Sequence, residues 1–178
     1  MVIKEKKVLF IIPPNNFRDE ELIEPRRILE SNKIRTLTAN STGKTSNGML
    51  GSKIEPNLTL DKVNVNDFDA IIFIGGSGST AYYTDKTAIN IAKEAYLKGK
   101  IVASICLASG VLAIAGLLKG KNATGFETTK ELIEKNGGIY KGTNIEISNR
   151  IITARDPQSA KEFGEAILKA LEVKKYED

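Results

Sequence analysis

Three continuous apolar runs constrain the fold of this chain more than any other feature of its sequence. They span residues 7–12, 68–74 and 100–105, and they are ended by prolines, by a glycine pair and by a cysteine. A strand that is apolar along its whole length is buried on both faces of its sheet. Helical patterns alternate with these strands, which is typical of βαβ units. The sequence therefore predicts an α/β fold, a three-layer sandwich with a mostly parallel central sheet, formed by a single domain over residues 1–178.

The remaining elements follow from periodicity and from turn residues. Residues 34–39, 145–147 and 150–154 have strand patterns, whereas the polar stretch 40–67, with its glycines and Pro56, predicts hairpins and loop. The spacing of apolar residues predicts helices over 19–32, 87–98, 108–118, 128–136 and 159–173. Pro25 falls inside the first of these, so that helix is expected to start late or to kink. Asp85 is expected to cap the helix that follows it.

Composition and charge exclude several classes of function. The chain is 41% hydrophobic and 27% charged, as in ordinary soluble proteins. No apolar run approaches the roughly 20 residues that span a bilayer, and no small-residue cleavage site follows the first run. We therefore expect a cytoplasmic protein that does not enter a membrane. The net charge of +4 comes from lysines scattered among acids, with no arginine cluster interleaved with aromatics, so no nucleic-acid partner is expected.

The complete absence of histidine restricts the chemistry that this chain can perform. Histidine is the usual general base near neutral pH and the commonest metal ligand. The one cysteine cannot form an intramolecular disulfide, which fits a reducing compartment, and it leaves no thiolate cluster for zinc. We expect no metal and no cofactor. Any reaction has to use Cys, Asp, Glu, Lys, Arg, Tyr, Ser or backbone groups.

That cysteine, Cys106, lies in the segment Ser-Ile-Cys-Leu-Ala, between a predicted strand and a predicted helix. Small residues two positions before and after a nucleophile are what a nucleophile elbow requires, because its backbone is strained and its neighbours are crowded. The N-terminus of the following helix favours a thiolate there. The N–H groups of Leu107 and of Gly75 or Gly76 are candidates for an anion hole. The alternative is that Cys106 is a small buried apolar residue.

Other candidate residues also follow predicted strands. Ligands of parallel α/β sheets bind beyond the carboxyl ends of the strands, where Asn16 and Arg155 are expected to lie with Gly75, Gly76 and Cys106. The sequence leaves two roles open for Tyr82 and Tyr83, namely lining a pocket or packing in a dimer contact.

Four motifs, in this order, resemble those of the ThiJ/PfpI superfamily, which includes the parkinsonism-linked deglycase and is related to the class I glutamine amidotransferases. They are Asp-Glu-Glu-Leu-Ile-Glu-Pro at 19–25, the Gly-Gly strand end at 68–76, Ala-Ser-Ile-Cys at 103–106 and Thr-Ala-Arg-Asp-Pro at 153–157. The resemblance covers nearly the whole chain. It implies a flavodoxin-like, class I glutamine amidotransferase-like sandwich.

The resemblance also implies roles for particular residues. Glu21 matches the family's acidic residue that hydrogen-bonds the cysteine, although by spacing alone it is equally one of several surface acids. A protonated Glu21 that donates to the sulfur would stabilise the thiolate. Arg155 matches a site-facing arginine that binds a carboxylate or phosphate, and its alternative is a structural pair with Asp19 or Asp156. Relatives of this type are dimers or larger homo-oligomers, so a homodimer or larger assembly is expected.

The chain departs from the family at two positions. Leu107 stands where peptidase-like members place a histidine after the cysteine, and Phe126 stands where deglycase-like members carry one near the substrate. The loop 77–84 contains no acid that replaces them. Without a base that protonates the leaving amine, a peptidase activity is not expected.

Three hypotheses about function remain from the sequence. In the first, the protein is an enzyme of glyoxalase or deglycase type on small reactive carbonyls, with Cys106 as nucleophile and Glu21 as proton partner. In the second, the same cysteine reacts with an oxidant, and the protein is a redox sensor or chaperone under oxidative or carbonyl stress. In the third, the chain has lost its chemistry and survives as a binding homologue.

Overall fold

The computed structural model of the chain describes residues 4–173, and its centre is a seven-stranded sheet. The strand order is β11-β12-β8-β7-β1-β3-β6, and every pair is parallel except β11 with β12. The strands of this sheet are β1 (Lys7–Ile11), β3 (Arg35–Asn40), β6 (Leu58–Thr59), β7 (Ala70–Phe73), β8 (Ile101–Ile105), β11 (Ile145–Ser148) and β12 (Ile151–Ala154). The mostly parallel sheet predicted from the apolar runs is confirmed.

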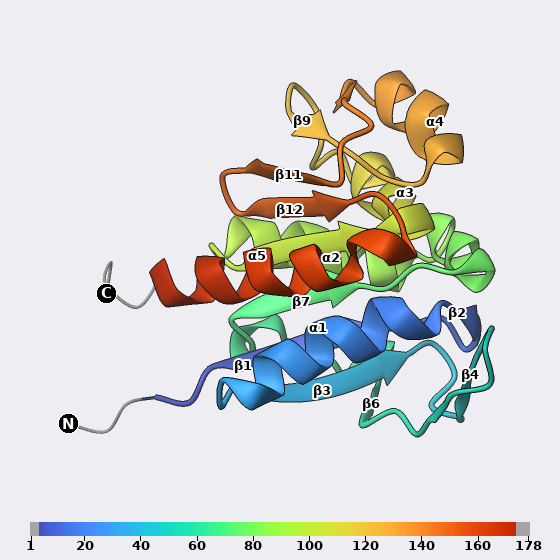
Figure 1. The fold of residues 1–178 in the computed structure, drawn as a ribbon. Coiled ribbons are helices and arrows are strands. Elements are labelled where there is room, and N and C mark those ends of the chain that lie inside the picture. The colour runs from blue at the N-terminus through green and yellow to red at the C-terminus, as the bar shows by residue number, and fades with distance from the viewer. Residues whose placement is uncertain (1–3, 174–178) are drawn as a thin grey trace.

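Helices cover both faces of the sheet, as the predicted sandwich requires. In Figure 1, α1 and α5 cross in front of the strands, and α2 and α3 lie behind them. The helices are α1 (Asp19–Ser31), α2 (Lys86–Leu97), α3 (Ser109–Ile114), α4 (Lys130–Lys135) and α5 (Ala160–Val173). Alternate residues of β1 enter two different apolar clusters: Phe10 packs on the side of α1 and α5, and Leu9 on the side of α2 and α3. Burial on both faces is the physical reason for the unbroken apolar runs.

Two predicted helices differ from the structure at their ends. The first starts at Asp19 rather than late, and Pro25 lies inside it. Pro25 packs against Gly164 of α5, where a Cβ atom would come within 2.8 Å of the Pro25 Cα. The third ends at Ile114 rather than Leu118, because Gly116 adopts a φ of 77° that turns the chain out of the helix.

Short elements account for the segments where periodicity is weak. The stretch 40–67 contains the predicted hairpin, β4 (Ser46–Gly48) with β5 (Lys53–Ile54), and β2 (Asn15–Phe17) pairs with it in a small second sheet. Strands β9 (Asn122–Ala123) and β10 (Ile139–Tyr140) form a parallel pair. The 3-10 helices are Leu60–Lys62, Val65–Asp67, Ser77–Tyr83, Cys106–Ala108, Glu127–Thr129 and Pro157–Ser159. No sequence pattern predicted β2, β6, β9, β10 or the 3-10 helices.

The parallel strands give the sheet two chemically different edges. Gly75, Cys106 and Arg155 follow β7, β8 and β12 and lie at the carboxyl edge, as predicted. Lys6 and Lys100 precede β1 and β8 and lie at the opposite, amino edge.

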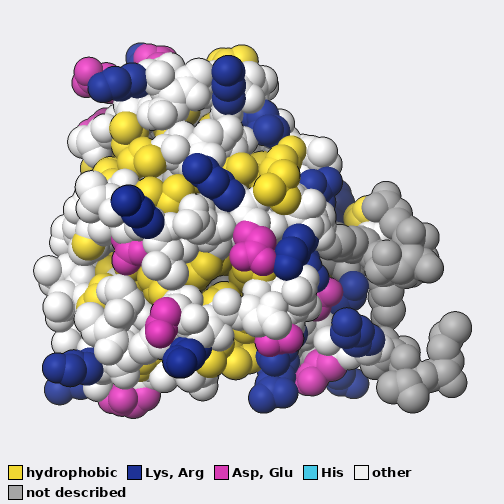
Figure 2. Space-filling view, turned by 180° about the vertical axis from the view of Figure 1, so that it is seen from behind, with side chains coloured by type: hydrophobic (Ala, Val, Ile, Leu, Met, Phe, Trp, Pro, Cys, Tyr) yellow, Lys and Arg dark blue, Asp and Glu magenta, His cyan; other side chains and the backbone are white. Residues whose placement is uncertain are grey.

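The face behind that of Figure 1 carries Lys and Arg side chains interspersed with Asp and Glu (Figure 2). Within residues 4–173, no helix has the length and apolar character needed to cross a membrane.

Candidate active site

Cys106 occupies a strained turn directly after β8. Its φ is 61°, in the left-handed region that costs a non-glycine residue on the order of 1–3 kcal/mol. The flanking Ser104 and Ala108 are 0% and 1% exposed, which explains why only small side chains fit there. The strained backbone and the crowded neighbours are those that the sequence predicted for a nucleophile elbow.

Hydrogen bonds from outside the turn hold it in place. The Phe126 N–H donates to the carbonyl of Cys106 at 3.2 Å, and the Tyr83 hydroxyl donates to the carbonyl of Leu107 at 2.6 Å. Beneath the turn, the buried hydroxyls of Ser104 and Ser109 are 2.9 Å apart and share a hydrogen bond. Two distant segments thus hold the backbone after the cysteine, and the serine pair joins the two ends of the turn.

Glu21 approaches Cys106 from the first turn of α1 and is completely buried. Its Oε2 accepts a hydrogen bond of 2.9 Å from the Gly75 N–H. A Cβ atom on Gly75 would lie 2.5 Å from that oxygen and 2.8 Å from the Cys106 Cβ, so the carboxyl and the cysteine meet across this glycine. Oε1 has no hydrogen-bond partner of regular geometry among the described residues. The carboxyl also interacts with the Cys106 thiol. This interaction lowers the pKa of Glu21 and raises the pKa of Cys106.

The surroundings of Glu21 keep its carboxyl protonated near neutral pH. Burial raises its pKa to about 8, against the opposing effects of the Cys106 thiol, the Gly75 N–H and the Arg18 charge. Glu20, the next residue in the helix, is instead paired with Arg18 at 2.8 Å. The alternative that Glu21 is one of several surface acids is therefore ruled out.

The thiol of Cys106 is also perturbed, in a direction that differs from the sequence-based expectation. Burial, and then the negative charge of Glu21, raise its pKa, whereas the N–H groups of Leu107 and Gly76 at the sulfur lower it. The thiolate-favouring effect expected from a helix N-terminus is outweighed because the thiol is only 6% exposed and α3 is short. Protonation of Glu21 removes its charge and turns its carboxyl into a donor, so the two groups titrate as a coupled pair.

Of the two glycines that the sequence offered for the anion hole, Gly76 is the candidate and Gly75 is not. The Leu107 and Gly76 N–H groups are the ones that lower the pKa of the Cys106 thiol. The Gly75 N–H is already used by Glu21. Gly76 has a φ of 106°, and a Cβ atom there would lie 2.2 Å from the Asn16 carbonyl oxygen, so both its conformation and its surroundings require glycine.

Arg155 is paired with Asp156, one of the partners predicted for its structural alternative. Its Nε donates to Asp156 at 2.8 Å, and its Nη1 donates to the Gly142 carbonyl at 3.2 Å. Asp19, the other predicted partner, instead accepts hydrogen bonds from the backbone N–H groups of Leu50 and Ser52. Within residues 4–173 the guanidinium makes no described hydrogen bond or ion pair with Cys106 or Glu21.

The other predicted substrate-binding residues differ in their placement. Phe126 is half-buried and packs, as Leu107 does, against the apolar cluster that contains Cys106. The side chain of Asn16 is exposed, and its φ of 56° places its carbonyl against Gly76. Phe126 thus lies beside the cysteine, whereas Asn16 contributes to the site through its backbone.

Tyr83 is the residue near the cysteine whose role the sequence left undecided. Burial, followed by the charge of Cys106, raises the pKa of its hydroxyl to about 12. Tyr82, by contrast, is almost fully buried and donates to the Ile12 carbonyl at 2.7 Å. Two adjacent tyrosines on one 3-10 helix point into different surroundings, which no periodicity could predict.

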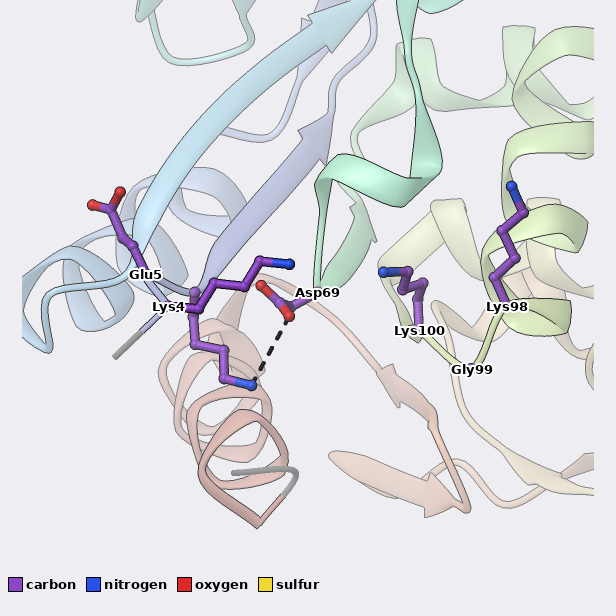
Figure 3. Close-up of a pocket in the computed structure, with 7 residues that line it drawn as sticks. Lys4, Glu5, Asp69, Lys98, Gly99 and Lys100 are labelled. Atoms are coloured by element: carbon purple, nitrogen blue, oxygen red, sulfur yellow. Dashed lines mark ion pairs between the residues drawn. The ribbon is translucent and has the colours of Figure 1, made fainter. Parts of the chain in front are cut away.

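Hollows outside this site lie at the opposite edge of the sheet. One, of about 460 Å³, is lined by Lys4, Asp69, Lys98 and Lys100 among others, and Figure 3 shows their side chains around it. A second, of about 310 Å³, adjoins it and includes Arg35. Neither contains a predicted site residue. Among residues 4–173, no group of three or more Cys, Asp or Glu side chains is placed to hold a metal ion.

A parallel α/β sandwich with a cysteine on a strained strand-to-helix turn defines the class of α/β proteins that carry a nucleophile elbow. Within that class, the chain belongs to the DJ-1/PfpI family, whose family model matches residues 6–170. The family named by the sequence resemblance is confirmed.

Similar proteins support this assignment over most of the chain. An uncharacterized protein of Methanocaldococcus jannaschii is 42% identical over 173 residues, which is 96% of this chain and 84% of that protein. A deglycase of Pyrococcus horikoshii is 31% identical over 85% of this chain and 90% of its own. A glutathione-independent glyoxalase of Caenorhabditis elegans is 28% identical over 94% and 90%. The crystal structure of a ThiJ/PfpI domain protein from Brachyspira murdochii matches with a TM-score of 0.93 at 29% identity, covering 96% of this chain and 99% of that one.

Proposed function

We propose that this protein is a cysteine-dependent enzyme that acts on small reactive carbonyl compounds such as 2-oxoaldehydes. The observation that carries the proposal is the buried pair of Glu21 and Cys106, in which a carboxyl with a pKa of about 8 lies against a thiol. A carboxyl with such a pKa both accepts and donates protons near neutral pH. The deglycase and glyoxalase names of the relatives support the same class of activity.

In the first step, the sulfur of Cys106 bonds to the aldehyde carbon of the substrate. The thiol proton passes through Glu21 to the carbonyl oxygen, and the product is a hemithioacetal. The Leu107 and Gly76 N–H groups, which face the sulfur, stabilise the negative charge that develops on that oxygen.

In the second step, the ionised fraction of Glu21 removes the proton from the former aldehyde carbon, which gives an enediol, and returns it to the adjacent ketone carbon. The hydroxyl proton of the hemithioacetal moves to the former ketone oxygen. The aldehyde carbon is thereby oxidised to a thioester and the ketone is reduced to an alcohol. Water then cleaves the thioester, which releases a 2-hydroxy acid and regenerates the thiol. No histidine assists the water, so hydrolysis depends on Glu21 and turnover is slow.

The experiment that tests this proposal is the conversion of methylglyoxal to lactate by purified protein. Wild type is expected to form lactate and Cys106→Ser to form none. Glu21→Gln is expected to reduce the rate by about 10²–10⁴, because its proton transfer is lost. Glu24→Gln, on the exposed face of the same helix, is the matched control and is expected to retain the rate. Equal lactate formation by wild type and Cys106→Ser would overturn the proposal.

A redox role for Cys106 is the second candidate, and the hydrogen-bonding capacity of the buried Glu21 favours it. Two equivalents of peroxide would convert the thiol to a sulfinic acid with release of two waters, and a protonated Glu21 would donate to the product. Intact-mass measurement after mild peroxide is expected to show two added oxygens in wild type and none at this position in Cys106→Ser. If Cys106 resists both oxidation and alkylation in the folded protein, the third hypothesis, an inert binding homologue, is favoured.

We also propose that the protein forms a homodimer or larger homo-oligomer, as the resemblance implies.

A further inference from the structure

We infer that Tyr83 is a positioning residue for Cys106, because its hydroxyl holds the turn that follows the cysteine so that the Leu107 N–H faces the sulfur. The inference concerns the reactivity of the cysteine, and only its consequence for turnover rests on the proposed function. Tyr83 makes no described contact with a reacting atom. It acts through the backbone of Leu107.

The first observation is how the Tyr83 side chain is seated. Its hydroxyl donates to the Leu107 carbonyl at 2.6 Å, and its ring lies against Gly110 of α3. A Cβ atom on Gly110 would come within 2.4 Å of the Tyr83 hydroxyl oxygen and ring carbon. Glycine inside a helix costs about 1 kcal/mol relative to alanine. Gly110, which is unfavourable in a helix, therefore stands where the Tyr83 ring packs against α3.

The second observation is that both peptide groups after the cysteine are held from outside. The Phe126 N–H holds the Cys106 carbonyl, and the Tyr83 hydroxyl holds the Leu107 carbonyl. Because a peptide group is planar, fixing the Cys106 carbonyl also fixes the Leu107 N–H on the same plane. The Tyr83 bond holds the next peptide plane, so both planes that flank the Leu107 Cα are held, and with them the Leu107 N–H that lowers the pKa of the thiol.

The neighbouring tyrosine provides a matched control. Tyr82 lies on the same 3-10 helix and also donates to a backbone carbonyl, that of Ile12, at 2.7 Å. It accepts a hydrogen bond of 3.2 Å from the Ser41 N–H, in the segment between β3 and β4. Removing either hydroxyl thus deletes a tyrosine-to-carbonyl bond of similar length. Only the loss at Tyr83 affects the turn that carries the Leu107 N–H.

The test is the rate of Cys106 alkylation by iodoacetamide across the pH range 6–11, in wild type, Tyr83→Phe and Tyr82→Phe, with thermal unfolding of all three. The single cysteine makes alkylation specific to this site. Both variants are expected to lose stability, Tyr82→Phe by more because it also removes the acceptor of the Ser41 N–H. Tyr83→Phe alone is expected to move the midpoint of the pH profile upward and to slow alkylation about five- to tenfold below it, which is the factor that one hydrogen bond supplies. Gly110→Ala, which displaces the ring but keeps the hydroxyl, is expected to change the profile in the same direction.

Two results would overturn the inference: an unchanged midpoint in Tyr83→Phe, or an equal shift in Tyr82→Phe, which would indicate a general loss of stability. The proposed function is tested separately, because alkylation requires no turnover. If Tyr83→Phe moves the profile while wild type forms no lactate from methylglyoxal, the positioning role stands and the proposed function fails. If wild type forms lactate and Tyr83→Phe keeps both its profile and its kcat, the positioning role fails alone.

Discussion

The carboxyl edge of the sheet has two halves, one around Cys106 and one around Arg155. The acid in the first is protonated, whereas the acid in the second is ionised and paired. In the Cys106 half, Glu21 is fully buried and bonded to a backbone N–H, and within residues 4–173 it forms no ion pair. In the Arg155 half, the Arg155 side chain is 41% exposed and is paired with the adjacent Asp156. A buried carboxyl escapes the cost of desolvation by holding a proton, whereas an exposed ion pair stays charged at all ordinary pH values. The first half thus holds a proton that can be exchanged, and the second holds an ion pair.

A position at the end of a parallel strand does not by itself determine how a side chain is held. Arg155 and Cys106 follow the adjacent strands β12 and β8. The environment of each side chain decides its role: Arg155 binds the Gly142 carbonyl and Asp156, whereas Cys106 meets a protonated acid and two N–H groups. Variants in each half test whether this division holds.

The largest expected effect is the pH dependence that Glu21 gives to stability. Its pKa is about 8 when folded and near 4.5 when unfolded, so the folded state binds the proton more tightly. Its contribution is complete below pH 4.5 and is lost as the pH rises toward 8. In Glu21→Gln, which cannot ionise, this loss of roughly 4–5 kcal/mol is expected to be absent. Urea unfolding of both proteins at pH 5, 6, 7 and 8 measures the difference.

The control for this measurement is Glu24→Gln, whose side chain is exposed on the same helix and paired with Arg27 at 3.0 Å. Its stability is expected to remain within about 0.5 kcal/mol of wild type at each pH. Parallel pH curves for wild type and Glu21→Gln would mean that Glu21 is ionised in the folded protein, and the contrast between the two halves would disappear.

The second prediction concerns the glycine across which the carboxyl and the cysteine meet. In Gly75→Ala the new Cβ would lie 2.5 Å from Glu21 Oε2 and 2.7 Å from the Ile105 carbonyl oxygen. Overpacking of this kind costs about 1–3 kcal/mol, and separation of Glu21 from Cys106 is expected to change the pH profile of alkylation. Gly116→Ala is the control, because it is strained by its φ of 77° but has open space around it. It is expected to lower stability and leave alkylation unchanged; equal profiles in the two variants would contradict the prediction.

The sequence predicts those features of this site that depend on local patterns. The apolar run before Cys106 and the small residues Ser104 and Ala108 together require a buried strand and a tight turn, and the structure has both. The family motif identifies Glu21 among several neighbouring acids. Its burial could not be derived from spacing, because Asp19, Glu20 and Glu21 all start one helix and differ only in the segments that pack on them.

Contacts between distant segments could not be predicted. The Gly75 N–H serves Glu21 rather than the anion hole, a choice between two consecutive glycines that depends on where α1 docks. Tyr83 reaches Leu107 across 24 residues, and it does so from a 3-10 helix whose sequence has no helical periodicity. The early end of α3 is set by the single residue Gly116, in a run that is otherwise apolar and helical in pattern.

A smaller effect is expected in the Arg155 half, from Asp156→Ala. Oδ1 of Asp156 accepts hydrogen bonds from the Ser159 N–H at 3.1 Å and from the Ser159 hydroxyl at 3.0 Å, so this carboxylate caps the helical segment that leads into α5. Loss of such a cap costs about 1 kcal/mol, which lowers the Tm of a protein of this size by about 2–4 °C. Calorimetry measures the shift. The alkylation profile of Cys106 is expected not to move, and a clear shift would connect the two halves.

The smallest effect is expected from Arg155→Gln. An ion pair with a partly exposed guanidinium contributes about 0–1 kcal/mol, so the free energy of unfolding is expected to change by less than about 0.5 kcal/mol. If the side chain is only a clip between Asp156 and the Gly142 carbonyl, kcat/KM for the uncharged methylglyoxal and for the anionic glyoxylate should keep their wild-type ratio. Selective loss of turnover with glyoxylate would instead show that the guanidinium leaves Asp156 to bind a substrate carboxylate. Arg155 would then belong to the reacting half of the edge, and the ion pair would be its resting position.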